Sequence, residues 1–357
     1  MGSRGQTRAV VYVVSLLVIP LAVASGYWAA ALRPDTRPAL TSALDVLPAR
    51  TTIVGFTDWS RIRDHVGLGN VDTRSERADL EGRAATRDLS TRSVLGRSVD
   101  EMHEDLGWST ADAEWEVYGQ DPVGAASVVR LDGSVSFDDV RDGLRAAGYA
   151  QDGTTLRAPE GASRLPQILT NVSLVPRQRL VVMSDEARQM SGVLAVVAGK
   201  ARSLAAGHAA ADTARALAGS DSVLMQGGRL ACQTTAIARD AELQRQARTA
   251  VERAGALQPY RFSGRALTDR GGSGFSAQRV VFAMTFDSAV EASEQADVRA
   301  RLTTGPFIGR TGPIDETLRL RSADADEATV RLDFAHDPDT NVFMTGTGPV
   351  LFASCDA

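Results

Sequence analysis

The first feature of the hydrophobic pattern is an uncharged stretch of 24 residues, 9–32, with Arg4 and Arg8 before it and Arg33 after it. A helix rises about 1.5 Å per residue, so this stretch reaches roughly 36 Å, enough to cross a hydrocarbon core of about 30 Å. The positive-inside rule places the basic end in the cytoplasm. We therefore expect residues 1–8 inside the cell, 9–32 as a single-pass transmembrane anchor, and the bulk of the chain outside the cytoplasm.

A cleaved signal peptide is the alternative interpretation of this segment. Ala22-Val23-Ala24 forms an A-x-A site followed by Ser25, where a signal peptidase could cut and release a secreted chain. Against cleavage, the apolar character continues through Tyr27 and Trp28 to Leu32, and such an aromatic pair suits the outer membrane interface. We favour the retained anchor.

After the anchor the pattern becomes discontinuous. Residues 33–46 hold two prolines and little apolar periodicity, as expected of a tether. The β-branched run 51–57 predicts a strand, and Asp58 can cap a helix over 59–65. Residues 72–92 carry charges of both signs and few apolar positions. We expect them to form an exposed, mobile helical segment that could order on meeting a partner.

Two further helices are predicted over residues 98–106 and 109–118. The second rests on Ser109 as N-cap with Asp112 three residues later. The aromatic side chains of this region are expected in the core, because core packing is commoner at this spacing than a carbohydrate platform: Trp108, Trp115 and Tyr118.

Strands and helices then alternate to the end of the chain. Capped helices are predicted after Ser136, from residue 185, and after Ser288 with Glu291. The predicted strands are 126–131, 154–157, 171–175, 179–183, 222–226, 265–268, 282–286, 316–321 and 329–334. Hairpins join many of them, which predicts an α+β fold of antiparallel sheets with helices on one face. Because the same order recurs, we expect two degenerate ferredoxin-like halves, in domains 47–218 and 219–357.

The charge balance limits the partners. The formal net charge is −5, and without Arg4 and Arg8 it becomes −5 − 2 = −7 for the exported part. A mildly acidic ectodomain argues against nucleic acid or anionic lipid as its main partner.

The two cysteines, Cys232 and Cys355, form an isolated pair in the C-terminal third. In an oxidising compartment such a pair predicts a disulfide. It would close a loop of about 120 residues, for which the chain-entropy model gives about 4 to 5 kcal/mol at most. Two buried free thiols acting as small hydrophobic side chains are the alternative.

No motif in the sequence assigns a catalytic, cofactor-binding or metal-binding residue. The four histidines stand at least 38 residues apart and lack zinc spacing. Gly199-Lys200 lacks the first glycine of a phosphate loop, no serine lies in G-x-S-x-G, and Asp324-Ala325-Asp326 fits a hairpin turn better than a calcium loop. We therefore predict no catalytic residue, no cofactor and no metal.

Three stretches carry a resemblance to known sequences: residues 47–59 (LPARTTIVGFTDW), 108–115 (WSTADAEW) and 171–176 (NVSLVP). They resemble exported actinobacterial proteins of no known activity. The 38 arginines against one lysine agree with a GC-rich genome. The resemblance implies a bacterial, cell-envelope location and transfers no functional residue.

Taken together, these features predict a non-enzymatic envelope protein that binds or scaffolds another component, with a protein partner in the envelope and no nucleic acid. An envelope enzyme, hydrolase-like, with an unrecognised site is the rival class. It would need a deep pocket holding titratable groups of shifted pKa. A lipid or glycan carrier is the third, and it would need a closed apolar cavity of some hundreds of Å³.

Overall fold

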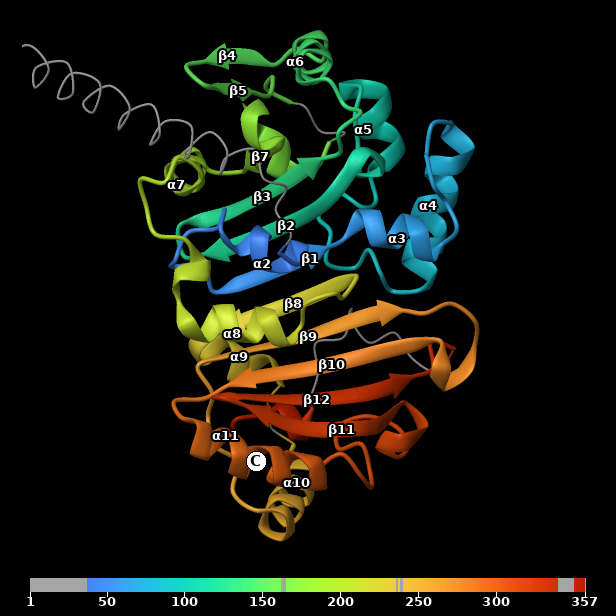
Figure 1. Cartoon of the computed structure of the whole chain (residues 1–357), viewed down its shortest axis with the longest axis vertical. Helices are drawn as coiled ribbons and strands as arrows, with labels where there is room; N and C mark the ends of the chain where they lie inside the picture. The colour runs from blue at the N-terminus through green and yellow to red at the C-terminus, as the bar shows by residue number, and fades with distance from the viewer. Residues whose placement is uncertain (1–36, 162–164, 236, 238–239, 340–349, 357) are drawn as a thin grey trace, which may run out of the picture. The chain divides into compact units, whose positions relative to one another are not determined.

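One antiparallel sheet of twelve strands runs through the part of the chain that the structure describes (Figure 1). This computed structural model describes residues 37–161, 165–235, 237, 240–339 and 350–356. The strands follow the order β11-β12-β10-β9-β8-β1-β2-β3-β7-β6-β5-β4. Their bounds are β1 Ile53–Thr57, β2 Ala113–Asp121, β3 Gly124–Leu131, β4 Ala150–Asp152, β5 Thr155–Arg157, β6 Asn171–Val175, β7 Leu180–Ser184, β8 Ser222–Gly227, β9 Phe262–Asp269, β10 Gln278–Thr285, β11 Leu318–Asp326 and β12 Thr329–His336.

Helices precede the first strand and occupy the longer connections between strands. Their bounds are α2 Ala39–Leu44, α3 Trp59–His65, α4 Arg74–Thr86, α5 Val99–Leu106, α6 Phe137–Ala146, α7 Ala187–Val197, α8 His208–Ala216, α9 Gly228–Thr235, α10 Ala241–Ala254 and α11 Ala289–Arg301. Short 3-10 turns include η1 Thr110–Asp112, η6 Ile314–Glu316 and η7 Leu351–Ala353. The antiparallel α+β fold class is thus confirmed.

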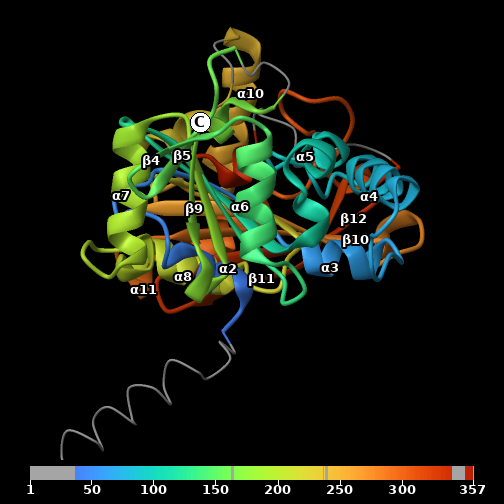
Figure 2. The same ribbon diagram turned by 90° about the horizontal axis from the view of Figure 1, so that it is seen from above.

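Helices cover both faces of the sheet. One hydrophobic core lies under α2, α7 and α8, and the other lies under α3 to α6 and α9 to α11 (Figure 2). Neighbouring strand residues alternate between the two cores: Val281 of β10 belongs to the first and Phe282 to the second. The prediction of helices on one face was wrong, because the strands are apolar on both sides and each face needs a cover.

The sheet is built from two halves with the same strand order. The first half reads β1-β2-β3-β7-β6, with β5 and β4 added outside it, and the second reads β8-β9-β10-β12-β11. Both halves carry helices between their first and second strands and one helix after the third. The repeated order that the sequence pattern predicts is therefore present.

The repeated unit is not ferredoxin-like, however. A ferredoxin-like fold contains two split β-α-β connections. Each half here contains one: α6, followed by the added strands β4 and β5, leads from β3 to β6 with β7 between them, and α11 joins β10 to β11 with β12 between them. In a ferredoxin-like fold a second split connection would place a strand on the other side of β3 or β10. Here that place is taken by β2 or β9, the strand that directly precedes it in the chain.

The two halves share the sheet rather than forming separate bodies. β1 pairs with β8 in a register centred on Gly55 and Leu224. The predicted boundary at residues 218 and 219 falls just before β8, and Pro38–Ala357 is one compact unit. The predicted tether, residues 33–46, also ends earlier than expected, because Leu40 and Leu44 of α2 are buried in the core.

Several local predictions are confirmed by hydrogen bonds at helix starts. Asp58 accepts from the backbone N–H of Arg61 to cap α3, and Ser288 accepts from that of Glu291 to cap α11. Residues 109–118 were expected to be helical, but the turn at Ser109 ends after η1 and β2 follows. Trp108 and Trp115 are buried as predicted, against different faces of the sheet.

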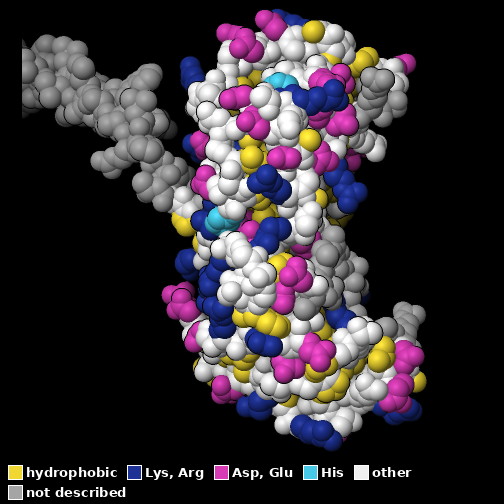
Figure 3. All heavy atoms as spheres, turned by 90° about the vertical axis from the view of Figure 1, so that its right-hand side faces the viewer, with side chains coloured by type: hydrophobic (Ala, Val, Ile, Leu, Met, Phe, Trp, Pro, Cys, Tyr) yellow, Lys and Arg dark blue, Asp and Glu magenta, His cyan; other side chains and the backbone are white. Residues whose placement is uncertain are grey.

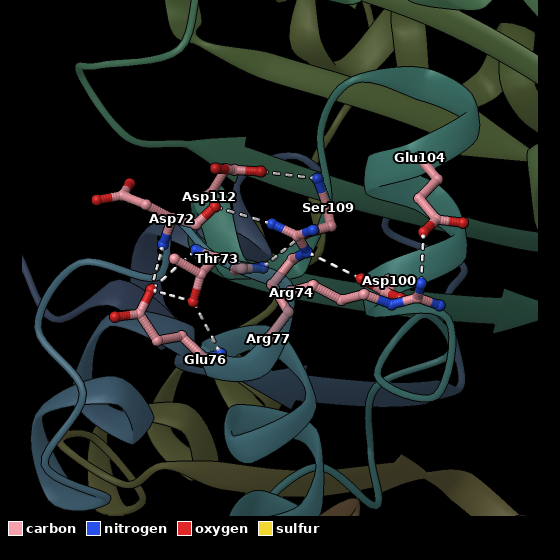
Figure 4. Close-up of polar contacts among 10 residues, drawn as sticks. Asp72, Thr73, Arg74, Glu76, Arg77, Asp100, Glu104, Ser109 and Asp112 are labelled. Carbon is pink, nitrogen blue, oxygen red and sulfur yellow. Dashed lines mark hydrogen bonds and ion pairs between the residues drawn. The ribbon is translucent and has the colours of Figure 1, made fainter.

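The polar segment 72–92 is anchored more firmly than its composition predicts. Thr73 and Glu76 form a capping box at the start of α4, and Arg74 and Arg77 both contact Asp100 of α5 (Figure 4). Arg77 is buried, as are the apolar side chains on the same face of the helix: Leu80, Ala84 and Leu89. Few other side chains of this segment are buried, as expected, and Arg77 reaches the core with the partly exposed Asp100 as its partner.

None of the helices described by the structure combines the length and hydrophobicity needed to span a membrane. The predicted span, residues 9–32, lies outside the described residues.

Candidate functional site

A cavity of about 740 Å³ lies in the second half, between α10, the end of α11 and the C-terminal turn η7. We call it the α10–α11 cavity. Its lining residues are Glu242, Arg245, Gln246, Thr249, Ala250, Arg253, Ala254, Arg301, Leu302, Thr304, Gly305, Pro306, Phe307, Ile308, Ile314, Leu351 and Phe352. The volume lies in the range typical of small-molecule sites. Figure 3 shows apolar side chains reaching the surface at the lower end of the molecule, where these helices lie in Figure 1.

One wall is a single face of α10. The lining positions 242, 245, 246, 249, 250, 253 and 254 recur at the three-and-four spacing that places side chains on one side of a helix. Asp240 caps this helix by accepting from the backbone N–H groups of Glu242 and Leu243, at 2.9 and 3.0 Å. The wall begins with polar residues and becomes apolar at Ala250 and Ala254.

The opposite wall is the segment after α11, folded into a fixed loop. The backbone N–H of Phe307 donates to the carbonyl of Gly312 at 3.0 Å, and that of Ile314 donates to Gly305 at 2.9 Å. Gly309 has a φ of 79°, in the left-handed region that favours glycine, which lets the loop turn back. Phe307, Ile308 and Ile314 are buried and turn apolar atoms toward the cavity.

The floor is formed by Leu351 and Phe352 of η7. The Phe352 ring contacts those of Phe282 and Phe334, with centroids 5.1 and 5.2 Å away. The contact with Phe282 is edge-to-face and that with Phe334 is tilted, and together they hold the Phe352 ring in one orientation. The floor is thus part of the packed core.

Arg299 of α11 fixes the backbone beneath that floor. Its fully buried guanidinium donates to the carbonyls of Phe352 and Ser354 at 2.7 and 2.9 Å, and lies over the rings of Tyr260 and Phe286. Burial lowers the pKa of Arg299 to about 10. The side chain still carries its charge at neutral pH, and three carbonyl partners, including Gln258, compensate its burial.

The predicted cysteine pair lies beside this floor. The Cα atoms of Cys232 and Cys355 are 5.2 Å apart and their sulfur atoms are within bonding distance. The bridge ties the segment after η7 to α9. Thr235 of α9 adds two hydrogen bonds: its hydroxyl donates to the carbonyl of Ala353, and its own carbonyl accepts from the hydroxyl of Ser354. The disulfide geometry expected from the sequence is present, and it secures the cavity floor.

The same place in the first half is closed. There α5 and α6 occupy the positions that α10 and α11 occupy in the second half. A Cβ at Gly143 of α6 would collide with the carbonyl of Leu106 of α5, so the two helices meet at the backbone. In the second half, α10 and α11 meet near Ala254 and Arg301, and the rest of the interval is the cavity. The repeated architecture permits a closed pair, so the opening is particular to the second half.

A second hollow, of about 530 Å³, lies between the end of α3, α4 and the turn after β9. We call it the α4 groove. Its histidine, His65, has Nδ1 at 2.9 Å from Oδ2 of Asp221, and this hydrogen bond raises the pKa of His65. Asp221 is fully buried and also pairs with Arg61 at 2.9 Å. A histidine oriented by a carboxylate is the arrangement of a general base.

The remaining features of the α4 groove argue for a structural network. Each charged lining side chain already has a partner there: His65 with Asp221, Asp79 with Arg83, and Arg87 with Asp269. The lining hydroxyl, that of Thr86, donates to the carbonyl of Gly82 at 2.8 Å within α4, and the lining carboxylates Asp79 and Asp269 are paired with arginines. Together, the His65–Asp221 and Arg87–Asp269 pairs join the ends of α3 and α4 to the neighbouring strands β8 and β9, because the backbone N–H of Asp269 also donates to Asp221.

No group of three or more His, Cys, Asp and Glu side chains within the described ranges is placed to hold a metal ion. The sequence did not point to the α10–α11 cavity either. Its walls come from three segments that are well separated in the sequence, 242–254, 301–314 and 351–352, and the lining residues form no motif. The amphipathic spacing of 242–254 was the available signal, and it is equally typical of an ordinary surface helix.

No known protein family and no curated protein matches the sequence. Among solved structures, crystal form I of TP0453 aligns with a TM-score of 0.41 and 9% identity, over 85% of this chain and 96% of that one. Crystal form III of TP0453 gives 0.41 and 9%, over 86% and 96%. At this TM-score the likeness decides nothing about function.

Proposed function

We propose that this chain is a non-enzymatic cell-envelope protein that binds a ligand with a long apolar part in the α10–α11 cavity. In this proposal residues 9–32 hold it to the membrane and the α+β unit lies outside the cytoplasm, in a bacterial and, by the resemblance of residues 47–59, actinobacterial envelope. The single observation that supports ligand binding is the cavity itself. Its volume is about 740 Å³, and its floor and far wall are apolar.

The energetics favour an apolar occupant. Burying apolar surface contributes roughly 25 cal/mol per Å², and a preformed cavity requires little ordering on binding. The packed floor at Phe352 and the hydrogen-bonded loop at Phe307 supply that preorganisation. A carrier or ligand sensor is thus better supported than a hydrolase, because the hydroxyl and carboxylate groups that line the α4 groove beside His65 are engaged with Gly82 and with arginines.

The test is binding of the neutral fluorescent probe N-phenyl-1-naphthylamine to residues 38–357, which form one compact unit with its own core. We expect saturable binding that is abolished by Ala250→Trp, because Ala250 lines the cavity and the indole would fill it. Ala241→Trp is the control, at an exposed position of the same helix outside the lining. Equal binding by both variants would refute the proposal.

A further inference from the structure

The charges around the α10–α11 cavity are not balanced. Its lining includes Arg245, Arg253 and Arg301 against one carboxylate, Glu242, which gives 3 − 1 = +2. The whole chain has a net charge of −5. Arg245 and Glu242 contact each other, so the local excess belongs to the other two arginines.

Arg253 and Arg301 both line the cavity near the C-terminal end of α10. Nε of Arg301 donates to the carbonyl of Ala254, the residue after Arg253, at 2.8 Å. Both side chains are exposed, and neither forms an ion pair with any residue that the structure describes. Arginines in the last turn of a helix complement its dipole. That role requires no cavity, and here both residues line one.

We propose that the cavity is selective for amphiphiles with an anionic head, a carboxylate or a phosphate, held between Arg253 and Arg301. The apolar chain then lies over Phe307, Ile308 and Leu351. This inference rests on the proposed function and adds the head group to it. Guanidinium groups match the two oxygens of a carboxylate or phosphate, and such charge-assisted hydrogen bonds are stronger than neutral ones.

The experiment compares amphiphiles of one chain length and different heads. Dodecanoate, dodecyl phosphate and neutral 1-dodecanol are each titrated as competitors of N-phenyl-1-naphthylamine bound to residues 38–357, at low and at high salt. We expect the two anions to bind more tightly than the alcohol. The double variant Arg253→Gln/Arg301→Gln should weaken both anions roughly tenfold or more and leave dodecanol unchanged. The two anionic arms show whether the site prefers a carboxylate or a phosphate.

Two controls keep the result interpretable. Arg248→Gln removes an exposed arginine from α10 outside the lining, and it should change nothing. Salt should weaken the binding of the anions to the unchanged protein and spare dodecanol. The inference is overturned if the anions and dodecanol bind equally in the unchanged protein, or if the double variant keeps the preference for anions. If the unchanged protein binds the probe and Ala250→Trp does not, the proposed function still stands even when the head-group inference fails. If the unchanged protein does not bind the probe, both the proposed function and the head-group inference are refuted.

Discussion

Buried carboxylates hold the first half of the molecule together at the residue scale. Glu116 on β2 is fully buried and accepts from the backbone N–H of Val94 at 3.0 Å, and from the side chains of Trp59, Ser93 and Ser127. Burial raises the pKa of Glu116 despite these donors. The hydrogen bonds join α3 and the loop before α5 to the sheet, so this carboxylate has a structural role.

Asp58, the N-cap of α3, gives a pH prediction of definite sign. Burial raises its pKa from 3.8 to about 6. Between these values the folded state binds more protons than the unfolded state, so stability falls as pH rises from about 4 to about 6. We expect Asp58→Asn to keep the cap and remove this part of the slope, worth up to about 3 kcal/mol. Urea unfolding of both proteins at several pH values measures the difference.

Neighbouring groups do not reverse this sign. Burial is the largest influence on the pKa of Asp58, Asp221 raises this pKa further, and Arg61 and Arg63 lower it without cancelling the rise. His65 has a raised pKa, so its contribution is constant below 6.5 and is lost only above that pH. A carboxyl of Asp58 that titrates near pH 4 in the folded protein, followed by NMR, would contradict the prediction.

At the scale of elements, caps and hairpins could be predicted from the sequence, whereas the helix predicted at 109–118 was wrong and the strand β2 is found there. Ser109 and Asp112 do form a capping box, but the turn that it starts has three residues. In the strand that follows, Glu116 points into the core with four donors around it. A charged residue at a buried position interrupts the alternation of apolar and polar residues that is typical of a strand. The apolar residues Trp115 and Tyr118, three positions apart, then match the spacing of a helix.

The candidate site was beyond prediction for a different reason. Its selectivity depends on Arg253 and Arg301 lacking carboxylate partners among the described residues, and pairing is set by the tertiary fold. The chain has 38 arginines and 44 acidic residues, and the sequence does not tell which acidic residue pairs with which arginine. Net charge therefore argued against anionic ligands for the molecule as a whole, while the cavity carries a local excess of the opposite sign.

Two helix glycines provide a matched test of how the elements pack. We expect Gly143→Ala to destabilise the protein by about 1–3 kcal/mol, because the new Cβ would collide with the carbonyl of Leu106 where α6 meets α5. Gly82→Ala in α4 should stabilise it by up to about 1 kcal/mol, since nothing lies within 4 Å and alanine favours the helix. Urea unfolding of both variants gives the two signs. A neutral Gly143→Ala would mean that α5 and α6 can separate, as α10 and α11 do.

At the scale of the whole molecule, one sheet joins two halves that share a strand order and differ in their outer parts. The central pairing of β1 with β8 involves two strands that are buried almost throughout, with Val54, Phe56, Val223 and Met225 in one core. The halves differ in whether their paired helices close on each other or leave a cavity. A ligand site can therefore arise in one half while the other half and the seam preserve the fold.

This continuity predicts that the halves cannot fold alone. Separate fragments 38–218 and 219–357 would expose β1 and β8 as apolar edge strands, which promote association. We expect neither fragment to be a monomer with a sharp thermal transition. Residues 38–357 should unfold in one cooperative step. A mixture of the two fragments should regain part of the circular dichroism signal of the intact unit. Size-exclusion chromatography and thermal melts compare them with the intact unit. A monomeric, cooperatively unfolding fragment would instead establish two independent domains, and the seam at Gly55 and Leu224 would then be an interface between them rather than the centre of one fold.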